Sequence, residues 1–100
     1  MTIYTRLKQD IRDELRESIL EDYSDLIDIQ MTCMSLYRHA YCCYKNDAIN
    51  HDEASTLGCT LKAVVRSISY SLYHNEWITI DDIIKMFDEN LERFENCSID

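Results

Sequence analysis

The sequence predicts an all-α fold, a small bundle of three or four helices, and three observations lead to this prediction. The 100 residues include one glycine and no proline, whereas average usage would give about seven and about five. Turns that need a positive or fixed φ should therefore be nearly absent, which argues against a β-rich fold. Apolar residues also recur at helical spacing, and two capping boxes precede such stretches.

The length predicts a single helical domain, 1–100, with a frayed tail at 96–100. No linker, repeat or low-complexity segment divides the chain. A chain this short buries only a modest core, so an oligomer is a reasonable expectation.

The first helix is predicted over Ile3–Glu21, with an apolar stripe of Leu7, Ile11, Leu15 and Ile19. The second is predicted over Asp25–Lys45, because Asp22 or Ser24 could cap it. The alternative is one long, bent helix from Ile3 to Lys45, since neither glycine nor proline interrupts this stretch.

The third helix begins with a capping box formed by Asn50 and Glu53. Its apolar positions follow at steps near 3.5 residues, so this should be the most buried helix; they are Ala54, Leu57, Leu61, Val64, Val65, Ile68 and Leu72. Gly58 lies inside it and is expected to permit a close helix crossing, because glycine within a helix costs up to about 1 kcal/mol relative to alanine.

The fourth helix begins with a second capping box, formed by Thr79 and Asp82. Its predicted core face consists of Ile83, Ile84, Phe87, Leu91 and Phe94. Glu89 and Arg93 are spaced for a favourable ion pair on the helix surface.

The net charge is −9, and both ends of the chain are acidic while the middle is neutral. Such a balance disfavours direct binding to nucleic acid or to an anionic membrane and favours a basic protein partner. No stretch approaches the ~20 apolar residues of a membrane span, and the N-terminus has no secretory signal. The five cysteines are an odd number and fit reduced thiols, so we expect a cytoplasmic protein.

The most distinctive feature is a row of six carboxylates in the first third of the chain: Asp10, Glu14, Glu17, Glu21, Asp25 and Asp28. On one continuous helix all six would occupy an arc of about 80°. Like charges at this spacing repel, and a face that only needs solubility would mix signs. The C-terminal carboxylates would extend this face if the first and last helices pack side by side; they are Asp81, Asp82, Asp88, Glu89, Glu92 and Glu95.

This row suggests mimicry of a nucleic-acid backbone. Carboxylates on successive helical turns rise about 5–6 Å per step, near the separation of neighbouring phosphates along a strand. Such a protein would occupy the basic cleft of a nucleic-acid-acting protein, as an immunity protein, antitoxin or anti-defence protein would. The alternative is a solvated helix face with no partner.

A second candidate surface is rich in tyrosine. Its interface residues are Met34, Tyr37, Tyr41 and Tyr44, and the three tyrosines share one helix face. Tyrosine, methionine and arginine are enriched at protein interfaces. A homodimeric adaptor, chaperone-like or regulatory subunit is therefore the alternative function. The remaining interpretation is that these tyrosines line the edge of the core.

Neither catalysis nor a cofactor is expected. The carboxylates lie on exposed faces where burial would not raise a pKa, and one glycine cannot build a phosphate-binding loop. No cysteine pair has the spacing of a structural zinc site; Cys42 and Cys43 are adjacent, which directs their thiols about 100° apart. We therefore expect no metal, and a cysteine nucleophile is the least favoured hypothesis.

Overall fold

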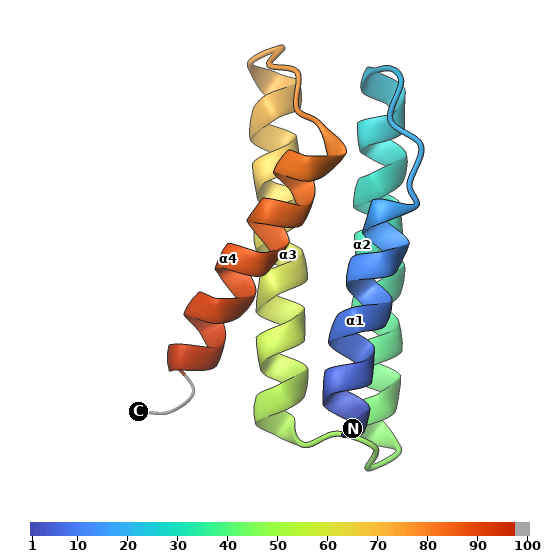
Figure 1. Ribbon diagram of the computed structural model, residues 1–100, viewed down its shortest axis with the longest axis vertical. Helices are drawn as coiled ribbons and strands as arrows, with labels where there is room; N and C mark the ends of the chain where they lie inside the picture. The colour runs from blue at the N-terminus through green and yellow to red at the C-terminus, as the bar shows by residue number, and fades with distance from the viewer. Residues whose placement is uncertain (98–100) are drawn as a thin grey trace.

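The computed structural model describes residues 1–97, and these form four helices and no strand (Figure 1). The helices are α1 (Ile3–Arg16), α2 (Tyr23–Lys45), α3 (His51–Tyr73) and α4 (Ile80–Cys97). The all-α bundle is therefore confirmed. Of the predicted frayed tail, 96–100, Asn96 and Cys97 are the last two residues of α4. Residues 98–100 lie outside the described residues.

The alternative of one long N-terminal helix is wrong, because α1 ends at Arg16 and α2 begins at Tyr23. Asp22 caps α2 by accepting hydrogen bonds from the backbone N–H groups of Ser24 (2.9 Å) and Asp25 (3.2 Å). The Asp25 carboxylate in turn accepts from the backbone N–H of Asp22 at 3.1 Å, which completes a capping box. These bonds satisfy donors that the first turn of a helix leaves unpaired, so a new helix starts here.

The break also corrects the predicted stripe of the first helix. Leu7, Ile11 and Leu15 are buried on α1, but Ile19 lies in the connection and is 70% exposed. Its apolar side chain continues the helical spacing in sequence only, because the helix ends one turn before it.

The helices form two layers. α2 packs along α3, and α4 packs against α3, while α1 contacts both α4 and α2. In Figure 1, α1 lies in front of α2 and α4 crosses in front of α3. One face of the α2–α3 pair is therefore covered by the other two helices.

The core lies between these layers, and α3 is the most buried helix, as predicted. Eight of its residues are buried: Thr56, Leu57, Gly58, Thr60, Leu61, Val64, Ile68 and Ser71. Phe87 of α4 is fully buried against this core. A Cβ atom at Gly58 would lie 2.9 Å from Cε2 of Tyr37, so the glycine accommodates a close approach of α2, as expected.

The connections after α2 and α3 correct the expectation that positive φ would be nearly absent. Asp47 has φ 61° and Asn75 has φ 54°, and each follows the cap of its helix. The next backbone N–H returns to the helix in both cases, from Ala48 to Cys43 O at 2.8 Å and from Glu76 to Ser71 O at 2.9 Å. Aspartate and asparagine thus replace the glycine that usually ends a helix in this way.

Candidate functional site

Three of the four basic residues of α1 form ion pairs with acidic residues of α4. Their N–O distances are 3.0 Å for Lys8–Glu95, 2.9 Å for Arg12–Asp88 and 3.2 Å for Arg16–Asp81. Arg12 binds Asp88 with two nitrogens, Nε at 3.1 Å and a terminal nitrogen at 2.9 Å. The pairs run in opposite directions along the two helices, which makes this seam antiparallel.

These pairs correct the expectation that the C-terminal carboxylates extend the acidic row. Asp81, Asp88 and Glu95 face cations of α1 and are neutralised by them. The predicted Glu89–Arg93 pair is replaced by one between Lys85 and Glu89 at 3.9 Å.

The hydrogen bonds around Glu95 shift two pKa values. The Tyr4 hydroxyl donates to Glu95 at 2.7 Å, and Lys8 donates at 3.0 Å. Burial, together with the hydrogen bond to Glu95 and its charge, raises the pKa of Tyr4. Burial opposes ionisation of Glu95, but the two donors outweigh it and lower the pKa of that carboxyl group. These groups hold α1 to α4.

The six carboxylates of the predicted row lie on three elements. Asp10 and Glu14 are on α1, Glu17 caps its end, Glu21 is in the connection, and Asp25 and Asp28 are on α2. The chain reversal nevertheless gathers four of them around one hollow of about 430 Å³, which we call the acidic hollow: Glu14, Glu17, Asp25 and Asp28. Ser18, Ile19, Ile29 and Thr32 complete its lining.

The four carboxylates differ in the hydrogen bonds that they accept and in their exposure to solvent. Asp25 accepts backbone N–H bonds from Glu21 at 2.8 Å and from Asp22, so its charge already serves the helix cap. Glu14, Glu17 and Asp28 are exposed. No basic residue is among those that line the hollow in the described chain. In residues 1–97, no group of three or more His, Cys, Asp or Glu residues has the arrangement of a metal site.

The helical spacing explains why bases and acids separate on α1. Lys8, Arg12 and Arg16 recur every four residues on one side of the buried stripe. Asp10 and Glu14 lie on the other side of that stripe. Packing α4 against the first side and α2 near the second therefore pairs Lys8, Arg12 and Arg16 and leaves Asp10 and Glu14 facing solvent.

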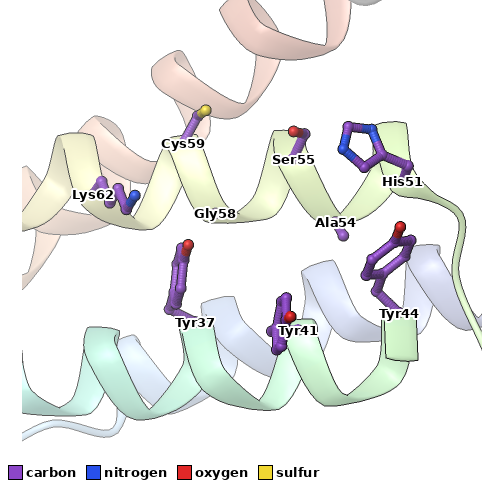
Figure 2. Close-up of a pocket in the computed structure, with 9 residues that line it drawn as sticks. All are labelled: Tyr37, Tyr41, Tyr44, His51, Ala54, Ser55, Gly58, Cys59 and Lys62. Atoms are coloured by element: carbon purple, nitrogen blue, oxygen red, sulfur yellow. The ribbon is translucent and has the colours of Figure 1, made fainter. Parts of the chain in front are cut away.

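The three predicted interface tyrosines lie together between α2 and α3, where they line a hollow of about 250 Å³ (Figure 2). In Figure 2 they rise from α2 toward α3, whereas Ser55 and Cys59 point away from α2. We call this the tyrosine hollow; its lining is Tyr37, Tyr41, Tyr44, His51, Ala54, Ser55, Gly58, Cys59 and Lys62.

Met34 lies outside the tyrosine hollow. It lines a second hollow of about 400 Å³ along the α2–α3 seam, which we call the methionine hollow: Ile27, Gln30, Met31, Met34, Ser35, Arg38, Val65 and Ser69. Sequence reasoning placed Met31 beside the tyrosine-rich segment but missed Ile27 and Lys62 as surface residues. Ile27 could have been found from the sequence, because it begins a series of apolar and aromatic residues, three or four apart, that runs to Tyr44 beside the buried stripe.

The cysteines divide by burial. Cys33 is fully buried, and burial raises the pKa of its thiol to about 12. Cys42, Cys59 and Cys97 are exposed. Cys43 Sγ lies 3.8 Å from Nε2 of His39, one turn earlier on the same helix. A reactive thiolate requires a lowered pKa, so burial makes Cys33 unsuited to be a nucleophile.

Comparison of this chain with protein-family models, with curated proteins and with solved structures finds no match. Within residues 1–97, none of the helices is both long and apolar enough to cross a membrane.

Proposed function

We propose that this protein acts by binding, and that the acidic hollow together with Asp10 and Glu21 contacts a basic surface of a protein that acts on nucleic acid. In this role it inhibits or neutralises its partner, as immunity proteins, antitoxins and anti-defence proteins do. The main support for the proposal is the ion pairing of the basic residues of α1 with α4. Lys8, Arg12 and Arg16 are paired with α4. This leaves Arg6 as the one base of α1 on the side that carries Asp10 and Glu14, and Arg6 does not line the acidic hollow.

The concave shape makes this proposal more specific than a line of charge would. A partner's lysine or arginine side chain could enter the hollow and meet Glu14, Glu17 and Asp28 from two elements. Charge-assisted bonds between guanidinium and carboxylate are about twice as strong as neutral ones. Steering between opposite charges would also accelerate association and make it sensitive to salt.

The break after Arg16 limits the mimicry. Only Asp10, Glu14 and Glu17 follow one another along α1 and its cap, with rises of about 5–6 Å on successive turns. The proposed contact is therefore with a compact basic cleft and not with a long strand-binding groove.

The proposal is tested by comparing the partners captured by the native protein and by a triple variant, Glu14→Lys/Glu17→Lys/Asp28→Lys. Asp25 is left unchanged because it caps α2. The control is Glu76→Lys/Glu89→Lys/Glu92→Lys, which changes net charge equally at exposed positions outside the hollow. Mass spectrometry of proteins from native lysate should show basic nucleic-acid-binding proteins with the native protein and the control only.

The captured partner is then titrated at two salt concentrations. We expect the affinity to fall as salt rises and to fall at least tenfold in the acidic-hollow variant. An affinity that is independent of salt, or that the control changes as strongly, would contradict the proposal.

A further inference from the structure

The exposed face of the α2–α3 pair carries a groove that the proposed function does not use. The methionine hollow and the tyrosine hollow follow one another along the same seam, and α2 and α3 supply all of their lining residues. We call the two together the outer groove. From Ile27 to Tyr44 it extends about 25 Å, at about 1.5 Å per residue.

The outer groove exposes large apolar side chains. Met31 is 64% exposed, Ile27 and Tyr41 are each 50% exposed, and Met34 is 37% exposed. Contiguous apolar side chains with a polar rim mark interaction sites, and flexible methionines adapt to the side chains of a partner. Tyrosine and arginine are also the residues that most often dominate binding energy at interfaces.

The charged residues that line the outer groove, Arg38 and Lys62, are basic, although the protein as a whole has a net charge of −9. Acidic residues adjoin the groove at its ends, Asp28 beside Ile27 and Asp52 beside His51. Neither 29–46 nor 54–75 contains an aspartate or glutamate. Arg38 lines the methionine hollow and Lys62 lines the tyrosine hollow. The ammonium group of Lys62 lies 5.0 Å from the ring centre of Tyr37, and that of Lys45 lies 5.4 Å from the ring centre of Tyr41.

The groove is formed in the free protein. At one end Gln30 donates to the carbonyl of Val65 at 2.9 Å and to the Ser69 hydroxyl at 2.7 Å, which fixes α2 on α3. Near the middle of the groove the ring of Tyr37 rests against Gly58. A groove held open by internal contacts binds without a large ordering cost.

We propose that the outer groove binds an amphipathic helix of a partner protein, with an apolar stripe flanked by acidic residues. Apolar anchors spaced at three and four residues would enter the methionine and tyrosine hollows. The flanking carboxylates would meet Arg38, Lys45 and Lys62. About 17 helical residues span the groove, at about 1.5 Å per residue.

A second copy of this chain fits the groove less well. Symmetric dimers place the same surface patch of both copies together. Arg38, Lys45 and Lys62 of both copies would then lie in one interface, and neither 29–46 nor 54–75 offers a carboxylate to compensate them. Charge complementarity therefore favours an acidic partner over the homodimer predicted from the tyrosine face.

The test uses a fluorescein-labelled, 18-residue synthetic helix with leucines at helical spacing and glutamates beside them. The matched probe has lysine at each glutamate position. Fluorescence anisotropy with the native protein should show at least tenfold tighter binding of the glutamate peptide. Arg38→Glu/Lys62→Glu should weaken that binding at least tenfold and strengthen binding of the lysine peptide.

Two further variants separate this site from general charge effects. Lys85→Glu/Arg93→Glu reverses the same number of charges on α4 and should leave the affinity unchanged. Arg38→Gln/Lys62→Gln is the milder replacement if the reversal disturbs folding, as judged by circular dichroism, and should also weaken binding. The acidic-hollow variant Glu14→Lys/Glu17→Lys/Asp28→Lys should bind the glutamate peptide as the native protein does, so this proposal fails or succeeds independently of the proposed function.

Several outcomes would overturn the proposal. They include no binding of the glutamate peptide, equal binding of both peptides, and binding unaffected by Arg38→Glu/Lys62→Glu. Sedimentation that shows a dimer at micromolar concentration, lost on Met31→Glu, would assign the groove to a second copy. Tighter binding of single-stranded oligonucleotide or of anionic vesicles, lost in the same charge reversal, would assign it to nucleic acid or membrane.

Discussion

The two antiparallel seams of this bundle, α1–α4 and α2–α3, use their basic residues in opposite ways. In the α1–α4 seam, Lys8, Arg12 and Arg16 are each paired with a carboxylate. In the α2–α3 seam, an aromatic ring packs on Gly58 and a glutamine bonds across the helices, while Arg38 and Lys62 line the outer groove. Although the net charge is −9, the bundle has one hollow lined by carboxylates without basic residues and one groove lined by basic residues without carboxylates.

Pairing inside one seam determines which charges remain to face outward elsewhere on the bundle. The paired side chains of the α1–α4 seam are mostly between a quarter and a half exposed, and exposed pairs contribute little to stability. Most of the free energy of unfolding should therefore come from the buried apolar residues, whereas the ion pairs determine which charges are exposed.

Removing a fully buried side chain of α3 should cost the most. Leu61 has no exposed surface, so Leu61→Ala should lower the free energy of unfolding by about 2–5 kcal/mol, through lost burial and the cavity left behind. Urea denaturation followed by circular dichroism measures this. A loss below about 1 kcal/mol would contradict the assignment of stability to the buried core.

The contact between Gly58 and Tyr37 should show as a coupling of about 1 kcal/mol or more. Alanine at position 58 improves helix propensity by up to about 1 kcal/mol, but its Cβ would lie 2.9 Å from the Tyr37 ring. We expect Gly58→Ala to stabilise the protein in a Tyr37→Ala background and to give little or no gain in the native background. Four urea curves complete the double-mutant cycle; additive effects would argue against this close approach.

Breaking one ion pair of the α1–α4 seam should have a small effect on stability. A double-mutant cycle of Arg12→Gln and Asp88→Asn should give a coupling of about 0.2–1 kcal/mol, because both side chains are over 40% exposed. Thermal melts at low and high salt measure it, and salt should reduce the coupling. A coupling above about 2 kcal/mol would mean that the seam carries stability as well as charge.

Glu95 should make only a small contribution to the pH dependence of the free energy of unfolding. Hydrogen bonds lower the pKa of this carboxyl below its ordinary value of 4.5. The stabilisation is therefore fully present above the unfolded-state pKa and is lost as pH falls through the folded-state pKa. Glu95→Gln should make the decline of stability between about pH 5 and pH 3 shallower, measured by urea denaturation at each pH. The same decline in both proteins would contradict the role given to Glu95.

The sequence predicted local features of the fold well and non-local ones poorly. The boxes at Asn50–Glu53 and Thr79–Asp82 depend on residues three apart, so both boxes are visible in the sequence and are confirmed. The end of α1 was harder to place, because apolar spacing continues to Ile19 although the helix does not.

The candidate sites depend on packing that no local pattern contains. The carboxylates predicted as one row are on three elements. Glu14 and Asp28 line the same hollow only because the chain reverses between them. Likewise, the C-terminal acids were expected to add to the acidic face, but their positions opposite α1 neutralise three of them. Which helices are neighbours could not be read from the pattern of charges alone.

The most direct test of opposite charges on separate faces is a backbone amide NMR titration with two peptides. One is an oligolysine peptide and the other is the glutamate-rich helix. We expect oligolysine to shift the signals of Glu14, Glu17 and Asp28, and the acidic helix to shift those of Met31, Arg38 and Lys62. Overlapping sets of shifted signals, or shifts spread evenly over the bundle, would contradict this expectation.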